Sequence, residues 1–253
     1  AGGKCEVWGC VQSPQAVRTD IAKRLGLDAA NVTVNVTLLG GGFGRKSKGD
    51  FATEAALVAK EWGGKPVKVV WTREDDLRHS YYHTVSLERL EAALDAGGKP
   101  TAWLHRSVGP TLMALFMPDP KVESAIEIGM GLANVPFAVP NLRVENPEAA
   151  AHVRIGWYRS VSNIPHAFAV HSFVDELARA AGRDPLEFML ELLGPPRQID
   201  PRELNDKWNH GEDPALYPLD VGRLRRVATT AAKAAGWSKP LPKGRGRGIA
   251  AHY

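Results

Sequence analysis

A glycine-rich loop is the part of this sequence whose residue types and spacing are best suited to chemistry. Gly40-Gly-Gly-Phe-Gly44 is followed by Arg45 and Lys46 and lies between a predicted strand and a predicted helix. Glycines let a backbone approach a ligand closely and adopt positive φ, so that neighbouring N–H groups can face an anionic or oxo group. A P-loop and a dinucleotide-binding turn both need a glycine where Arg45 or Ser47 stands. The loop therefore predicts a ligand site of another kind, with a merely flexible turn as the alternative.

The elements that would position this loop are of both kinds. Alternating β-branched residues and short apolar runs predict strands over 4–11, 31–39, 66–71, 85–94, 101–108, 142–144 and 152–155. Apolar residues spaced by three or four predict helices over 14–25, 50–62, 165–181, 185–194 and 221–235. In the helix over 50–62 we expect Ala55, Leu57, Val58 and Ala59 to pack inward.

This mixture of elements predicts an α+β fold in which helices pack on mixed sheets. The glycine-rich turn at 95–98 predicts a hairpin between two of the strands. Helices dominate the later part of the sequence. We therefore expect residues 1–145 to form an α+β part that carries the glycine-rich loop, and residues 146–253 to form a mainly helical part that ends in a truncated strand.

Composition limits the classes of function. The chain has 253 residues, 44% of them hydrophobic and 24% charged, and its net charge is +4. Acidic and basic residues are mixed along the sequence, so we expect no nucleic-acid partner. No apolar run approaches the length of about twenty residues that spans a membrane. The two cysteines, Cys5 and Cys10, are too few for an iron–sulfur cluster, which needs about four ligands.

Several sequence blocks together resemble one enzyme family. Besides the glycine-rich loop, they are Val11-Gln-Ser-Pro-Gln15, Val69-Val-Trp-Thr-Arg-Glu-Asp-Asp76, Tyr158-Arg-Ser-Val161, Phe173-Val-Asp-Glu-Leu-Ala178 and Gly182-Arg-Asp-Pro-Leu-Glu-Phe188. In this order they resemble the molybdopterin-binding large subunit of the xanthine dehydrogenase/aldehyde oxidase family, and the wording is closest to the isoquinoline 1-oxidoreductase beta-subunit-like branch. The chain is similar to an internal fragment of such a bacterial subunit.

The resemblance implies roles for particular residues. Gln12 would donate a hydrogen bond to an oxo ligand of the metal, and Arg159 would orient a substrate. The full set of implied cofactor-binding residues is Gln12, Gly41, Gly42, Phe43, Gly44, Arg45, Arg159 and Ser160. Taken singly, Gln12 has the alternative of a surface glutamine and Arg159 that of an ordinary ion pair. No residue of the chain is expected to ligate a metal, and His79 with His83 lacks the glutamate of a metalloprotease motif.

The same resemblance implies an oxidoreductase that hydroxylates an aldehyde or an N-heterocycle with water. The implied cofactor is molybdenum-molybdopterin, in the cytosine dinucleotide form, and the electrons pass to [2Fe–2S] centres on a small iron–sulfur partner subunit. Relatives that hydroxylate purines carry a glutamate just after the glycine-rich loop, and this chain has none there, which disfavours xanthine as the substrate.

The family's general-base glutamate would lie beyond Tyr253. The chain alone is therefore expected to hold no catalytic residue and to be inactive. The alternative is a non-catalytic binding or assembly module of the same architecture. The compartment stays open between cytoplasm and periplasm.

Overall fold

Two compact units make up the chain in the computed structural model, which describes residues 2–204, 206 and 209–253. Unit 1 comprises Ala1–His83 and Val153–Arg159, and unit 2 comprises Thr84–His152 and Ser160–Tyr253. The chain thus passes between the units at positions other than 145/146. The expected division into 1–145 and 146–253 stays a prediction.

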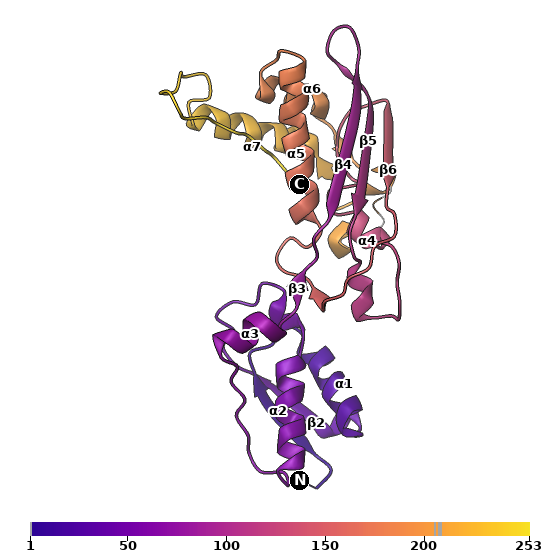
Figure 1. Ribbon diagram of the computed structural model, residues 1–253, viewed down its shortest axis with the longest axis vertical. Helices are drawn as coiled ribbons and strands as arrows, with labels where there is room; N and C mark the ends of the chain where they lie inside the picture. Colours follow the sequence, from indigo (N-terminus) through magenta and orange to yellow (C-terminus); the bar gives the residue numbers. More distant parts are fainter. Residues whose placement is uncertain (1, 205, 207–208) are drawn as a thin grey trace. The chain divides into compact units, whose positions relative to one another are not determined.

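Unit 1 is built on two parallel strands, β1 (Cys5–Gly9) and β2 (Val32–Val36). Helix α1 (Pro14–Leu25) has the predicted bounds, because Pro14 opens its first turn and Gly26 ends it in the left-handed conformation. Helix α2 (Asp50–Glu61) follows the glycine-rich loop and packs against α1 (Figure 1). The buried core of this unit consists of Val7, Val11, Val17, Ile21, Ala22, Val32, Ala52 and Ala56.

Two predictions for unit 1 were wrong. In α2 the buried residues are Ala52 and Ala56, whereas Leu57 and Val58 are exposed, because the small alanine side chains form the face that packs on α1. Residues 66–71 form no strand and run as an irregular connection. After them come helix α3 (Arg73–His79) and two short parallel strands, β3 (Tyr82–His83) and β7 (Ile155–Gly156). The strand pair draws residues 153–159 into unit 1.

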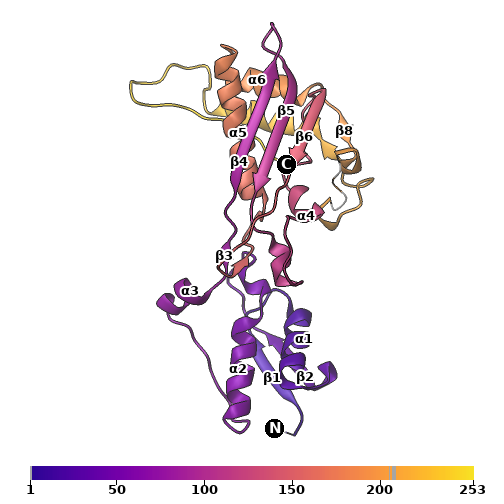
Figure 2. The same ribbon diagram turned by 45° about the vertical axis from the view of Figure 1, so that its right-hand side comes forward.

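Unit 2 is a three-stranded sheet covered by helices. The predicted hairpin is present as β4 (Leu87–Leu94) and β5 (Pro100–Val108), and β6 (Asn141–Glu145) adds to β5 in parallel. Helix α5 (Asn163–Ala180) lies along this sheet, and α6 (Pro185–Leu193) packs on α5 (Figures 1 and 2). Trp103 of β5 is 2% exposed and lies in the core that these helices complete. Parallel and antiparallel pairs coexist, which confirms the α+β class.

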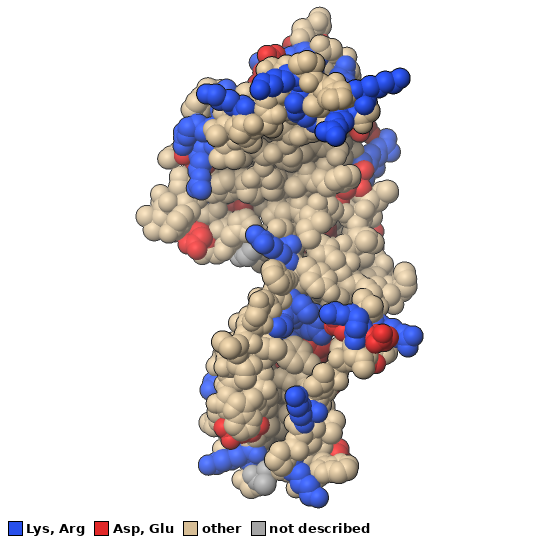
Figure 3. Space-filling view, turned by 90° about the vertical axis from the view of Figure 1, so that its left-hand side faces the viewer, with Lys and Arg blue, Asp and Glu red and all other residues tan. Residues whose placement is uncertain are grey.

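Unit 2 also contains α4 (Ala125–Ile128), α7 (Val221–Ala234) and the antiparallel pair β8 (Gln198–Ile199) with β9 (Leu219–Asp220), besides short 3₁₀ turns. Helix α7 packs on α6. On the face of unit 2 shown in Figure 3, Lys and Arg side chains gather at the upper end of the view and a broad uncharged surface lies below them. Within the described residues, no helix is long and apolar enough to cross a membrane.

Candidate functional site

Gln12 lies in the turn between β1 and α1, and its side chain contacts the glycine-rich loop. Its Oε1 accepts a hydrogen bond from the N–H of Gly44 at 3.0 Å, and its backbone N–H donates to the carbonyl of Lys46 at 2.8 Å. A Cβ at Gly42 would lie 2.3 Å from Cδ of Gln12, so a larger residue there would displace the Gln12 side chain from this position. Because the amide oxygen accepts from Gly44, the Nε2 group keeps its hydrogens for another acceptor. This geometry suits the donor role expected for Gln12.

The loop itself has amide groups to offer. The N–H groups of Gly41, Gly42 and Phe43 have no acceptor among the residues that the structure describes. Phe43 adopts φ 48°, and its ring is 63% exposed beside Gly41, where a Cβ would lie 2.6 Å from the ring. A non-glycine residue in this conformation costs about 1 kcal/mol or more and persists where surrounding contacts hold it. The loop is therefore shaped for a ligand that its backbone can approach.

A third segment contacts the same loop. A Cβ at Gly44 would lie 2.9 Å from the carbonyl oxygen of Trp157 and 3.2 Å from Cα of Tyr158, and Gly44 has φ 84°. The hydroxyl of Tyr158 donates to the carbonyl of Tyr81 at 2.7 Å, and its ring stacks on His83 at 6.1 Å between centroids. Gln12, the glycine-rich loop and residues 157–158 are thus brought together within unit 1 although they are far apart in sequence.

Arg45 fixes the loop to its neighbours by its side chain. Its guanidinium makes a bidentate ion pair with Asp50, at 2.8 and 3.0 Å, and its Nε donates to Oγ of Ser80 at 2.7 Å. The Arg45 and Asp50 side chains are 17% and 14% exposed. Two parallel N–H···O bonds of this kind are strong and directional. The guanidinium already binds these partners, so only the backbone of Arg45 is free to contact a cofactor. The expected contact of Arg45 with the cofactor stays a prediction.

Lys48 is a site residue that the sequence did not indicate. It is 9% exposed, and its Nζ lies 2.8 Å from the centroid of the Trp157 ring. No described residue accepts a hydrogen bond from this amine. Burial lowers the pKa of Lys48 to about 7, with the charge of Arg45 contributing to the fall and Asp50 opposing it. A lone lysine and a lone tryptophan carry no spacing that could have revealed this contact.

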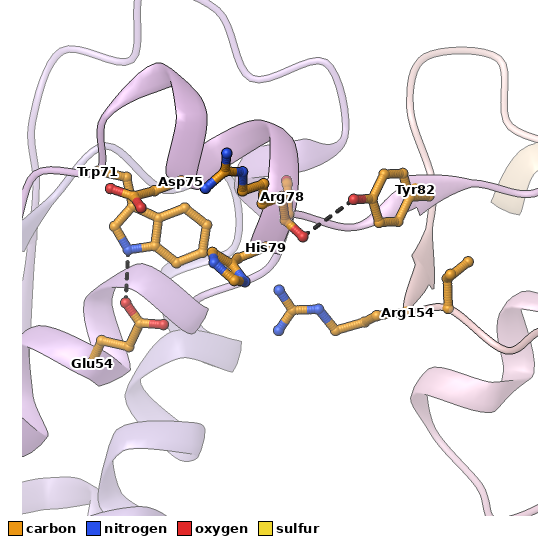
Figure 4. Close-up of a pocket in the computed structure, with 9 residues that line it drawn as sticks. Glu54, Trp71, Asp75, Arg78, His79, Tyr82 and Arg154 are labelled. Carbon is orange, nitrogen blue, oxygen red and sulfur yellow. Dashed lines mark hydrogen bonds between the residues drawn. The ribbon is translucent and has the colours of Figure 1, made fainter.

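An open groove of about 690 Å³ lies elsewhere on unit 1 (Figure 4). Its lining includes Glu54, Trp71, Arg78, His79 and Arg154. The indole N–H of Trp71 donates to Glu54 at 2.8 Å, as the dashed line shows. Within the described residues, no three His, Cys, Asp or Glu side chains are placed to hold a metal ion. Its lining residues make the groove polar and mixed in charge, and none of the expected site residues lines it.

Arg159 and Ser160, the last two expected site residues, lie where the chain leaves unit 1. Arg159 is exposed at the end of unit 1, next to Tyr158. Ser160 begins the return to unit 2 and adopts φ 70°, and Val161 adopts φ 46°. Two successive non-glycine residues in the left-handed region mark a strained turn. The cofactor contacts expected of Arg159 and Ser160 stay predictions.

Unit 2 contains a separate buried polar cluster. The Glu88 carboxylate accepts a hydrogen bond from Nε2 of His105 at 2.7 Å, and Glu127 accepts one from the backbone N–H of Leu112 at 2.7 Å. Glu123 is 5% exposed, and its Oε2 has no partner among the described residues. Burial raises the pKa of Glu123 to about 7, and the charges of Glu127 and Glu88 add to the rise. This cluster makes the stability of unit 2 sensitive to pH.

Comparison with known protein families shows to which family the chain belongs. A model of the molybdopterin cofactor-binding domain matches residues 1–191, which include Gln12, the glycine-rich loop and the 157–160 segment. The chain belongs to this family. The match confirms the resemblance seen in the sequence blocks and the class of cofactor.

Curated relatives of this molybdopterin-binding chain are oxidising enzymes or their subunits. It is 32% identical to the B subunit of nicotinate dehydrogenase from Pseudomonas putida, over 78% of this chain and 17% of the relative. It is 30% identical to the beta subunit of isoquinoline 1-oxidoreductase from Brevundimonas diminuta, over 76% of this chain and 25% of the relative. A membrane-bound aldehyde dehydrogenase of Gluconacetobacter polyoxogenes, whose name includes pyrroloquinoline quinone, is 32% identical over 98% of this chain and 32% of the relative. The chain thus spans a third or less of the length of these relatives.

Solved structures agree on the fold of this family member. The aldehyde oxidoreductase of Desulfovibrio gigas superposes with a TM-score of 0.68 at 19% identity, over 95% of this chain and 25% of that structure. The described residues also fit the cofactor class by their own geometry. Gly44 leaves no room for a Cβ, and a Cβ at Gly42 would displace the Gln12 side chain. Three loop amides have no acceptor among these residues, and the Nε2 group of Gln12 is available as a donor.

Proposed function

We propose that this chain is the part of a molybdenum hydroxylase subunit that holds one side of the molybdopterin cofactor, and that the full-length protein oxidises an aldehyde or an N-heterocycle with water. The observation that carries the proposal is the contact of Gln12 with Gly42 and Gly44, which fixes a side-chain donor beside a row of backbone donors. Relatives named for nicotinate, isoquinoline and aldehyde oxidation support the substrate class.

The chain's own residues supply orientation and hydrogen-bond donors. When bound, the cofactor supplies the oxidising equivalents and activates water, which is chemistry that protein side chains lack. Gln12 would offer its Nε2 hydrogens to an acceptor of the bound cofactor, because its Oε1 already accepts from Gly44. The amides of Gly42 and Phe43 are placed to bind anionic groups, and the exposed ring of Phe43 is placed to cover an apolar substrate. A preorganised donor of this kind contributes most when negative charge develops in the transition state.

Three finer features belong to this proposal. The cofactor is the cytosine dinucleotide form, and the electrons leave through [2Fe–2S] clusters on a small partner subunit. The nicotinate and isoquinoline relatives are both named as subunits, which supports a multi-subunit enzyme. Cys5 and Cys10 are free thiols and are too few to hold such a cluster in this chain. The general-base glutamate belongs to another part of the full-length protein.

Metal and pterin analysis of the purified full-length protein tests the proposal. We expect about one molybdenum per large subunit, together with a pterin that fluoresces after oxidative release. Gln12→Ala should retain the metal, because Gln12 contributes one hydrogen bond among many contacts. A full-length protein that is folded and free of molybdenum, when produced in cells that make the cofactor, would refute the proposal.

A further inference from the structure

The buried amine of Lys48 has no role in the function proposed above. Its Nζ has no hydrogen-bond acceptor among the described residues, and Lys48 is 9% exposed. Burying an ammonium without an acceptor is unfavourable, and unsatisfied buried polar groups are rare in native proteins. Such a group needs another contact that offsets its desolvation.

The compensating contact is the face of Trp157. A cation over an indole ring is attracted by the negative face of the ring, most strongly where water is excluded. Nζ of Lys48 lies 2.8 Å from the Trp157 centroid and 5.6 Å from the Tyr81 centroid. The other charged groups near it are Arg45, which disfavours the charged amine, and Asp50, which favours it.

The stem of Lys48 also packs on the same segment. A Cβ at Gly156 would lie 3.0 Å from Cε of Lys48, so the backbone before Trp157 passes directly over this side chain. Lys48 ends the 3₁₀ turn formed by Arg45–Ser47, which directly follows the glycine-rich loop. Gly44, at the other side of that turn, contacts the carbonyl of Trp157. Lys48 and Gly44 therefore hold the 156–158 segment at two points.

We propose that Lys48 is a positioning residue, which clamps the Trp157-Tyr158-Arg159 segment against the turn after the glycine-rich loop and thereby sets how that segment meets the cofactor. The clamp itself follows from contacts within unit 1, and its consequence for the cofactor rests on the proposed function. The hydrogen bond from Tyr158 to the carbonyl of Tyr81 is the second restraint on the segment. Lys48 acts through Trp157 and does not itself touch the ligand.

The test compares Lys48→Met with Lys48→Arg in the full-length protein. Methionine keeps an unbranched chain and removes the charge, whereas arginine stays charged and stacks on aromatic faces. The control is Lys65→Met, which removes an exposed cation 5.9 Å from the Trp62 ring in the same unit. Two readouts are needed, one that is independent of the cofactor and one that depends on it.

Limited trypsin digestion of the metal-free protein, at a pH below 7 so that the Lys48 amine is charged, is the first readout. Arg159 is exposed and follows the clamped segment directly, and the exposed Lys243, far along the chain from that segment, serves as the internal reference site. We expect Lys48→Met to speed cleavage after Arg159 about tenfold relative to cleavage after Lys243, as loss of a desolvated cation–π contact implies. Lys48→Arg should restore slow cleavage, and Lys65→Met should leave it unchanged.

Molybdenum retention through gel filtration, with kcat and KM, is the second readout. We expect Lys48→Met to lose metal faster than the wild type and Lys48→Arg to retain it. Unchanged cleavage in Lys48→Met would overturn the clamp. Faster cleavage with normal metal retention and kinetics would overturn the positioning role while the proposed function stands. A wild type without molybdenum would refute the proposed function, and the digestion would still decide whether the clamp exists.

Discussion

Gly42→Ala is the substitution that most directly tests the contact between Gln12 and the glycine-rich loop. An alanine Cβ would lie 2.3 Å from Cδ and 2.4 Å from Oε1 of Gln12, far inside van der Waals contact. Gly42 has no positive φ, so alanine brings no backbone strain and the whole cost is steric. Overpacking of this kind costs about 1–3 kcal/mol. If Gln12 swings away instead, Gly44 loses its acceptor, at about 1 kcal/mol.

A double-mutant cycle separates this clash from any other effect. Gln12→Ala removes the atoms that the new Cβ would meet, so adding Gly42→Ala to it should cost almost nothing. Because the swing of Gln12 limits the cost in the wild type, the coupling energy should be about 1 kcal/mol. The assay is urea unfolding of the 253-residue chain followed by tryptophan fluorescence. Gly246→Ala is the control, because a Cβ there meets no atom within 4 Å. An equal cost of Gly42→Ala with and without the Gln12 side chain would refute the contact.

Three further predictions concern activity, pH and partners. Gln12→Ala in the full-length enzyme should lower kcat about 10²–10³-fold with little change in KM, measured on preparations matched for molybdenum, because a preorganised donor acts on developing charge; wild-type turnover in a loaded variant would mean that Gln12 is not the donor. Since the pKa of Glu123 is raised from 4.5 to about 7, the folded state binds more protons than the unfolded state between these values, so stability falls as pH rises through that window. Glu123→Gln should remove up to about 3 kcal/mol of this loss at pH 8 and little at pH 4, measured by urea unfolding at both pH values with exposed Glu61→Gln as the control. The active enzyme should copurify with a small iron–sulfur protein, and active preparations without iron would contradict this.

The sequence predicted correctly those elements whose ends are marked by capping, proline, glycine or turn residues. Helix α1 has the predicted bounds because Pro14 and Gly26 mark them, and α6 begins at Pro185 after Asp184, whose side chain accepts from the N–H groups of Leu186 and Glu187. The hairpin of β4 and β5 follows equally from its glycine-rich turn. Helix α3 was missed although its signal was present. Thr72 and Asp75 form a capping box there, a pattern that the sequence shows directly.

Burial in α2 could not be predicted because it depends on the partner surface. Periodicity identifies an apolar face of the helix. The face that packs on α1, however, is the one with the small side chains of Ala52 and Ala56, which let the two helices approach closely. Leu57 and Val58 are left exposed. The ion pair of Arg45 with Asp50 was equally hidden, since the two residues are five apart across a turn and a helix start, which is not a helical spacing.

The glycines of the loop show why a motif can predict a site without its geometry. Gly42 is required by the side chain of Gln12, whereas Gly44 is required both by its φ of 84° and by the backbone of Trp157. Substitution at Gly44 would therefore be strained whatever its neighbours, while substitution at Gly42 is tolerated once Gln12 is shortened. The two glycines look alike in sequence, but different contacts restrict the two positions. Phe43 lies between them with φ 48° and an exposed ring, and this backbone conformation is costly for a non-glycine residue. Backbone strain at such a position is typical of a preformed ligand site. The shape of this loop, and with it the proposed function, therefore depends on the contacts of Gly42 and Gly44.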